Sequence, residues 1–196
     1  MREAIDQAPT SLEPPVQLLD DHHLVVLSED AAARAVFAAR LADQLDRVPE
    51  SEVTVLPGGA IDLPGFCRAV QSAFRLKRVI RPDLGEIIQS LRRRPTRTKR
   101  AYLIWPDAEE MLEHDVDLFG RLVNALLAAA AEREYVSPDV LLLQRVIFLG
   151  GNKLGAYAEC ELGQFCTWRT DDEASTFWRV FACLDRPPVL TYRLDG

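Results

Sequence analysis

The sequence predicts an α/β domain, namely a three-layer α/β/α sandwich built on a mainly parallel sheet of about five strands. Short apolar runs alternate along the chain with longer segments in which apolar residues recur at helical spacing. The short runs are apolar throughout, which is typical of parallel strands covered by helices on both faces. The composition, 48% hydrophobic and 27% charged, is that of a globular chain and excludes disorder along its whole length.

The first two predicted strands flank a helix whose start is marked by a capping residue. Residues 23–27 form a run of apolar, β-forming residues and are predicted to be a strand. Asp30 is a good N-cap for a helix over 31–47, which ends at the proline that follows. The second strand is predicted over 52–56, because a proline and two glycines come directly after it.

The same signals place the remaining elements. Apolar residues on one face mark each helix, and Pro64 stands where a proline is favoured, in the first turn of the helix after the second strand. The predicted helices cover 64–74, 82–93, 108–113, 115–135 and 172–184, and the remaining strands cover 102–105, 145–149 and 189–194. Connections between parallel strands of this kind should be right-handed.

The chain is predicted to form a single domain over residues 23–196, preceded by a flexible arm at 1–22 that is polar and rich in proline. No apolar run reaches the ~18 residues that a membrane-spanning helix needs, and the arm lacks the apolar core of a secretory signal. We therefore expect a cytoplasmic protein without a membrane partner. The four cysteines form no C-x2-C pair and lie far in sequence from the three histidines, so we expect neither a metal nor a cofactor.

Polar residues follow three of the predicted strands at their carboxyl ends. These segments are Ser28-Glu29-Asp30, Pro106-Asp107-Ala108-Glu109 and Gly150-Gly151-Asn152-Lys153. Ligands of open parallel sheets bind at the carboxyl ends of the strands. The residues Asp107, Asn152 and Lys153 are therefore candidates for a ligand site at the carboxyl edge.

The order and spacing of the elements over residues 23–155 resemble a P-loop NTPase of the additional-strand type, the group that contains the AAA+ ATPases. In that family the first strand runs into G-x-x-x-x-G-K-[ST], whose backbone N–H groups and lysine bind the phosphates. Here the turn after the first strand is Ser28-Glu29-Asp30, and no glycine precedes Gly58. Two carboxylates in this short turn repel a triphosphate. We therefore expect that the phosphate-binding loop is absent.

The residues after the third strand also depart from the family pattern. The resemblance implies an Asp that holds magnesium, followed by a Glu that polarises water. In direct register Pro106 stands at the metal position and Asp107 at the water-activating position. A shift by one residue makes Asp107 a magnesium ligand and puts Ala108 in place of the Glu. Alternatively, Asp107 caps the helix that follows. Asn152 matches the polar sensor of the family or is a turn residue beside two glycines.

A strongly basic segment covers residues 75–100. It contains ten basic residues and two acidic ones, whereas the rest of the chain contains 13 basic and 28 acidic residues. Its last part links a helix to the third strand and should lie at the amino edge of the sheet, opposite the expected ligand edge. We define the basic loop as residues 92–100, and its candidate docking residues are Arg92, Arg93, Arg94, Arg97, Lys99 and Arg100.

The basic loop has three interpretations. It is solvated or paired with acidic residues of the same chain, it docks an acidic surface of a partner or of a second copy, or it contacts nucleic-acid phosphates. Nucleic acid is the weakest of the three because the net charge of the chain is −7 and the loop has no aromatic residue for base stacking.

The sequence thus favours a non-catalytic interaction or scaffold domain that has an ATPase-like fold and binds an unknown protein partner or itself. No catalytic residue is assigned. The first alternative is a nucleotide-responsive or weakly hydrolytic NTPase module that uses the carboxyl edge of the sheet. The second is a nucleic-acid adaptor that works through the basic loop.

Overall fold

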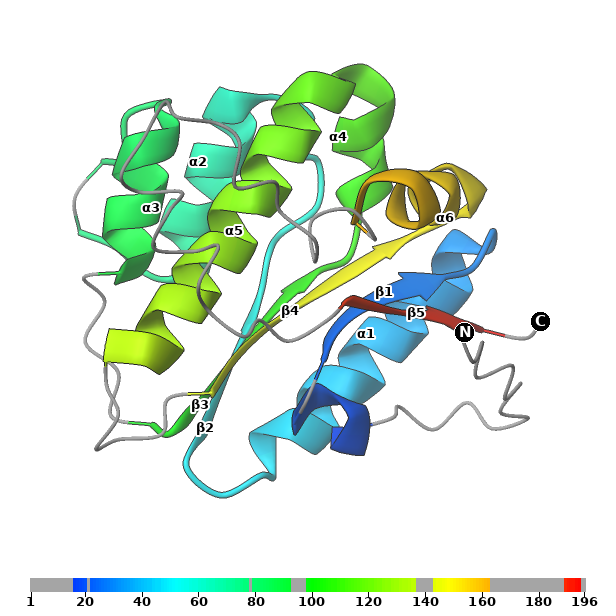
Figure 1. The fold of residues 1–196 in the computed structure, drawn as a ribbon, viewed down its shortest axis with the longest axis horizontal. Helices are drawn as coiled ribbons and strands as arrows, with labels where there is room; N and C mark the ends of the chain where they lie inside the picture. The colour runs from blue at the N-terminus through cyan, green and yellow to red at the C-terminus, as the bar shows by residue number, and fades with distance from the viewer. Residues whose placement is uncertain are drawn as a thin grey trace.

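The computed structural model describes residues 16–20, 22–77, 79–92, 98–136, 143–162 and 189–194. Five parallel strands form one sheet in the order β2-β3-β4-β1-β5 (Figure 1). The predicted α/β sandwich is confirmed, with a sheet that is parallel throughout. The elements are η1 (Val16–Asp20), β1 (His23–Leu27), α1 (Ala31–Asp46), β2 (Ser51–Val55), α2 (Leu63–Ala73), α3 (Leu84–Arg92), β3 (Arg100–Trp105), α4 (Ala108–His114), α5 (Val116–Val136), β4 (Leu143–Gly150), α6 (Asn152–Tyr157), η2 (Ala158–Leu162) and β5 (Val189–Arg193).

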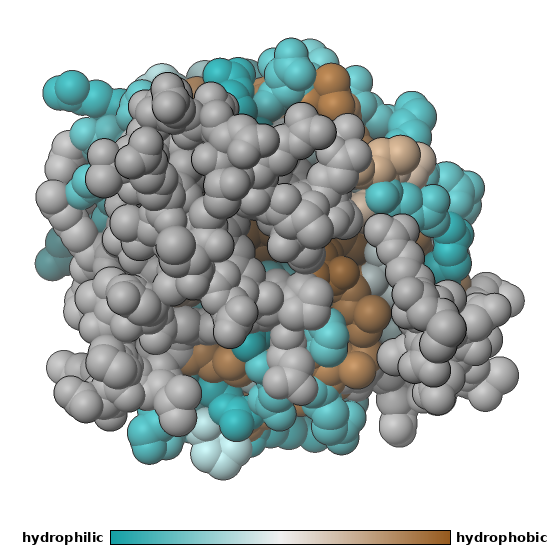
Figure 2. Space-filling model, in the orientation of Figure 1, coloured by the Kyte–Doolittle hydropathy of each residue, from teal (hydrophilic) through white to brown (hydrophobic). Residues whose placement is uncertain are grey.

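Successive residues of each strand point to opposite faces, so the sheet has an apolar core on each side. The core on one face is the larger of the two. Helices α2, α3, α4 and α5 contribute their apolar residues to this core (Figure 1). Trp105 at the end of β3 is 1% exposed, and its ring centroid lies 4.7 Å from that of Phe66 and 5.7 Å from that of Phe119. In the view of Figure 2 the described surface is mainly polar at its rim, with apolar residues nearer the middle.

The opposite face is covered by α1 and η1. Phe37, Leu41 and Leu45 of α1 are buried against this face, at the helical spacing that the sequence predicts. Leu19 of η1 is fully buried in the same core, so the end of the predicted arm packs against the sheet. The Asp30 carboxylate accepts a hydrogen bond from the Ala32 N–H at 2.8 Å, which confirms Asp30 as the N-cap of α1.

The predicted strands and helices within the described residues are present, with ends shifted by one or two residues. The predicted helix over 172–184 lies outside the described residues. Three elements were not predicted, namely η1, α6 and η2. Asn152 begins α6, so its interpretation as a turn residue is wrong. No helix in the described part of the chain combines the length and the apolar character that crossing a membrane requires.

Candidate functional site

The carboxyl edge of the sheet brings together residues that follow β1, β3 and β4, because β4 lies between the other two strands. Two carboxylates reach the first turn of α6. Glu109 accepts hydrogen bonds from the N–H of Gly151 at 2.7 Å and from the N–H of Leu154 at 3.0 Å. Glu29 accepts a hydrogen bond from the Asn152 N–H at 2.6 Å. We call Glu29 and Glu109 the carboxylate clamp.

The carboxylate clamp satisfies N–H groups that an isolated helix leaves unpaired at its start. It also requires a glycine at position 151. A Cβ on Gly151 would lie 2.8 Å from Glu29 Oε1 and 2.9 Å from Glu109 Oε2, closer than side chains tolerate. The clamp therefore puts two negative charges at this point of the carboxyl edge, and these charges disfavour a phosphate group there.

The turn between β1 and α1 is three residues long and its polar groups bond within the protein. The Ser28 N–H donates to the Gly150 carbonyl oxygen at 2.9 Å. The Asp30 N–H donates to the Ser28 hydroxyl at 3.2 Å, and the Asp30 carboxylate caps α1. Arg34, one turn into α1, donates back to the Ser28 carbonyl oxygen at 2.5 Å. The start of α1 is thus capped by a carboxylate of the protein itself.

Asp107 occupies the N-cap position of α4, but its side chain makes no capping hydrogen bond. The capping interpretation is thus correct for the position and wrong for the side-chain bond. The carboxylate lies against the glycine turn that follows β2, since a Cβ on Gly58 would come 2.5 Å from Asp107 Oδ2. Asp107 is partly exposed at the carboxyl edge.

Lys153 pairs with α4. Its Nζ lies 2.6 Å from Glu113 Oε1, and both side chains are largely exposed. The hydrogen bond and the charge of Glu113 raise the pKa of Lys153 above its usual value. Asn152 has its side chain in solvent and its N–H on Glu29. Among the described residues, no hydrogen bond or ion pair joins Asp107 to Asn152 or Lys153.

The sequence therefore placed Asp107, Asn152 and Lys153 at the carboxyl edge, where they lie, but missed the carboxylate clamp. Glu109 stands in an acidic helix start, which by itself indicates only a favourable interaction with the helix dipole. Glu29 stands in a turn beside another acid. Neither pattern carries a local signal for a bond to a helix that begins 43 residues or more further along the chain, at Asn152.

The basic loop ends at the amino edge of the sheet, where Arg100 is the first residue of β3. Arg93, Arg94 and Arg97 lie outside the described residues, as does the side chain of Arg92. At the end of the loop, Lys99 pairs with Glu50 at 2.7 Å, and Arg100 pairs with Asp20 at 3.1 Å. These two residues thus follow the interpretation in which basic residues pair with acids of the same chain.

A buried polar group lies at the first residue of β1, at the amino edge of the sheet. The His23 Nδ1 accepts a hydrogen bond from the Val146 N–H at 3.0 Å. Burial, together with the positive charge of Arg145, lowers the pKa of His23 from 6.5 to about 3, so the imidazole is neutral. Arg145 donates to the carbonyl oxygens of Gln144 at 3.0 Å and Asp20 at 2.6 Å. The guanidinium thereby connects η1 to β4.

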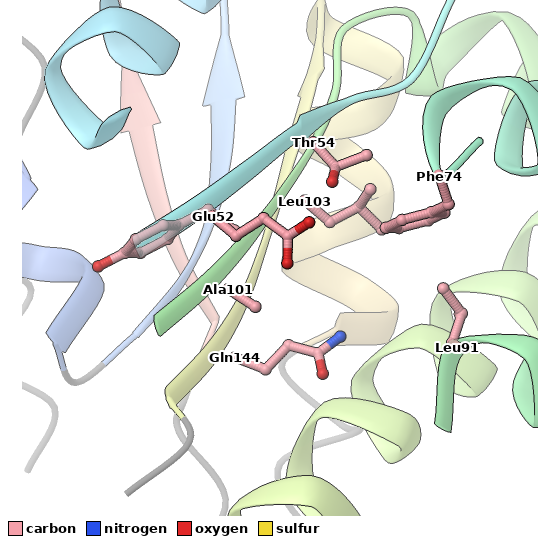
Figure 3. A pocket seen from close by; sticks show the side chains of 8 residues that line it. Glu52, Thr54, Phe74, Leu91, Ala101, Leu103 and Gln144 are labelled. Atoms are coloured by element: carbon pink, nitrogen blue, oxygen red, sulfur yellow. The ribbon is translucent and has the colours of Figure 1, made fainter. Parts of the chain in front are cut away.

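A small open hollow lies on the face of the sheet that carries α2 and α3 (Figure 3). Its empty space is about 300 Å³, including its open mouth. Glu52, Thr54 and Gln144 form a polar floor, with apolar residues around it. The remaining lining residues are Phe74, Leu91, Ala101, Tyr102 and Leu103. In the described part of the chain, no three His, Cys, Asp or Glu side chains are grouped as a metal site would require.

Comparison of the chain with models of protein families, with curated proteins and with solved structures finds no match.

Proposed function

We propose that this chain is a non-catalytic interaction domain with an ATPase-like fold, and that it docks an acidic protein surface through the basic loop. The observation that carries the non-catalytic part of the proposal is the carboxylate clamp. Glu29 and Glu109 place fixed negative charge at the carboxyl edge and bind the N–H groups of α6. An ATPase needs the opposite arrangement, with free N–H groups and positive charge facing the phosphates.

The strand order supports the resemblance to the additional-strand group. The resemblance implies one strand inserted between the first strand and the strand that precedes the magnesium-binding Asp. In this chain β4 lies between β1 and β3. The order also differs from the two common doubly wound orders, in which the first and third strands of the chain are neighbours or are separated by the second strand.

The charge distribution supports the basic loop as the docking surface. Residues 75–100 carry ten of the 23 basic residues of the chain and two of its 30 acidic residues. Lys99 precedes β3 and Arg100 is its first residue. The loop therefore reaches the sheet at its amino edge, away from the carboxylate clamp. Complementary charge of this kind steers a negatively charged partner to one side of a molecule and sets the orientation in which it docks.

The docking test uses fluorescent polyglutamate as the acidic probe, with single-stranded and duplex DNA of similar length as competing probes. We expect polyglutamate binding that weakens as salt rises. The triple variant Arg93→Ala, Arg94→Ala and Arg97→Ala should lose it. The matched control removes the same charge from exposed helix positions, by changing Arg40, Arg68 and Arg121 to Ala, and should bind like the unmodified chain.

Two results would contradict the proposal. Equal loss of binding in the loop variant and the control would show that binding depends on the net charge of the chain and not on a defined surface. Tighter binding of either DNA than of polyglutamate would favour the nucleic-acid adaptor.

A thermal-shift assay with ATP, GTP and ADP, with and without magnesium, tests the remaining alternative, the nucleotide-responsive module. At 100 times Kd a bound nucleotide adds about 2.7 kcal/mol, a rise in Tm of several degrees, whereas we expect no shift.

A further inference from the structure

Strand β2 has one edge that no strand of the described chain pairs with. The Leu56 N–H donates to the Ile104 carbonyl oxygen at 2.9 Å, and the Arg100 N–H donates to the Glu50 carbonyl oxygen at 3.1 Å. In a parallel ladder, alternate residues bond to the same neighbour. Even-numbered residues of β2 therefore bond to β3, and the N–H and C=O groups of Val53 and Val55 point away from the sheet.

This outer edge has one protective feature, the charged side chain of Glu52, and lacks others that natural proteins use to block pairing. Exposed edges are commonly protected by lysine, proline or a bulge. β2 reads Ser-Glu-Val-Thr-Val, with neither lysine nor proline, and Val55 is 41% exposed at its end.

We propose that β2 pairs antiparallel with β2 of a second copy of this chain, about a twofold axis at Val53. In this register Val53 lies opposite its own copy, Glu52 opposite Thr54, and Ser51 opposite Val55. Val53 and Val55 lie on the α1 face, where Val53 already packs against the core. Opposed valines on one face are a favourable cross-strand pair.

The register also avoids a clash of like charges. Glu52 is the single charged residue of β2 and meets the Thr54 hydroxyl of the other copy, whereas a shift of register that put Glu52 opposite Glu52 would be repulsive. The Ser51 N–H already donates to the Val48 carbonyl oxygen at 3.3 Å. The Ser51 carbonyl oxygen and the outward groups of Val53 and Val55 allow about four hydrogen bonds between the copies. A twofold contact is closed, so it yields a dimer with one continuous sheet and no open filament.

The dimer is independent of the proposed function, because the pairing edge of β2 contains no residue of the basic loop. The two contacts also respond differently to salt. Docking of an acidic partner by the loop weakens when salt screens the charges. Backbone hydrogen bonds and valine contacts persist in molar sodium chloride. Measuring mass at both salt concentrations therefore separates a failure of one proposal from a failure of the other.

The first experiment measures the molar mass of the full chain by sedimentation equilibrium in low and in molar sodium chloride. We expect a dimer in both and a monomer for Val55→Lys, because a lysine on an edge strand discourages pairing with a second strand. Val116→Lys is the matched control, since Val116 is an exposed valine at the start of α5, and it should remain a dimer. A monomeric unmodified chain at high micromolar concentration, or a dimeric Val55→Lys with native circular dichroism, would overturn the proposal.

The second experiment tests the register by disulfide formation. Opposed residues of a hydrogen-bonded antiparallel pair have Cα atoms about 5.5 Å apart, within the range of a disulfide. Val53→Cys should form a covalent dimer under mild oxidation, and Val55→Cys, on the same strand and face, should not. The unmodified chain shows the background from the native cysteines. Crosslinking through position 55 and not through position 53 would exclude pairing about Val53.

Discussion

The Glu109 carboxylate lies 2.7 Å from the backbone nitrogen of Gly151, so the residue that follows β3 holds the start of the helix that follows β4. Glu29, which follows β1, binds the next N–H of the same helix. Three neighbouring strand ends are thereby connected through one helix start. The edge at which parallel sheets commonly bind ligands is stabilised here by the protein's own carboxylates.

Glu109→Ala should destabilise the fold, because it leaves the N–H groups of Gly151 and Leu154 without their acceptor. Loss of a partner for a largely buried donor costs about 1–3 kcal/mol. The measurement is the free energy of unfolding from urea denaturation. Glu110→Ala is the matched control, an exposed carboxylate of the same helix turn, for which we expect a change within about 0.5 kcal/mol. Equal effects of the two substitutions would show that the clamp contributes no stability.

Gly151→Ala should also destabilise the fold, through steric conflict with both carboxylates of the clamp. A cost of about 1–3 kcal/mol is expected for an overpacked buried position. The diagnostic measurement is a double-mutant cycle with Glu29→Ala, which removes the oxygen that the new Cβ would meet at 2.8 Å. The alanine should then cost less in the Glu29→Ala background than in the unmodified chain. Strict additivity would contradict the proposed conflict.

The parts of the fold that depend on local patterns were predicted well from the sequence. β1 was predicted at 23–27 and found at His23–Leu27, because a fully apolar run predicts a buried strand wherever it lies. The carboxyl edge could be located for the same reason, since the direction of the strands fixes where polar residues after them gather. Asp107, Asn152 and Lys153 do lie at that edge.

The missed features depend on contacts between distant segments. α6 begins at Asn152, beside glycines that indicate a turn, and its first N–H groups bond to Glu29 and Glu109. The end of the predicted arm forms η1, whose Leu19 is buried by the sheet and α1. Five residues cannot form a stable helix alone, so no local pattern predicts one. Tertiary contacts stabilise both segments.

Leu19→Ala should destabilise the protein by about 2–5 kcal/mol, because this side chain is fully buried in the core on the α1 face. The measurement is again urea denaturation, with Gln17→Ala as an exposed control in the same turn. A small effect of Leu19→Ala, similar to that of the control, would mean that η1 contributes little to the free energy of unfolding.

The buried His23 should make the protein less stable as the pH falls below neutral. Its pKa is about 3 in the folded chain and near 6.5 in the unfolded chain. Between these pH values the unfolded state binds a proton that the folded state does not bind. The contribution of His23 to stability is complete above pH 6.5 and is lost as the pH falls from 6.5 towards 3, with a slope of up to about 1.4 kcal/mol per pH unit.

His23→Gln isolates this contribution, since the amide oxygen is an acceptor for the Val146 N–H and does not titrate. The free energy of unfolding, measured between pH 7 and pH 4, should fall less steeply for His23→Gln than for the unmodified chain. His114→Gln, at an exposed position, should retain the full slope. Since each variant differs from the unmodified chain at one histidine, the difference in slope reports that histidine. Identical slopes for His23→Gln and the unmodified chain would mean that the imidazole does not stay neutral in the folded protein.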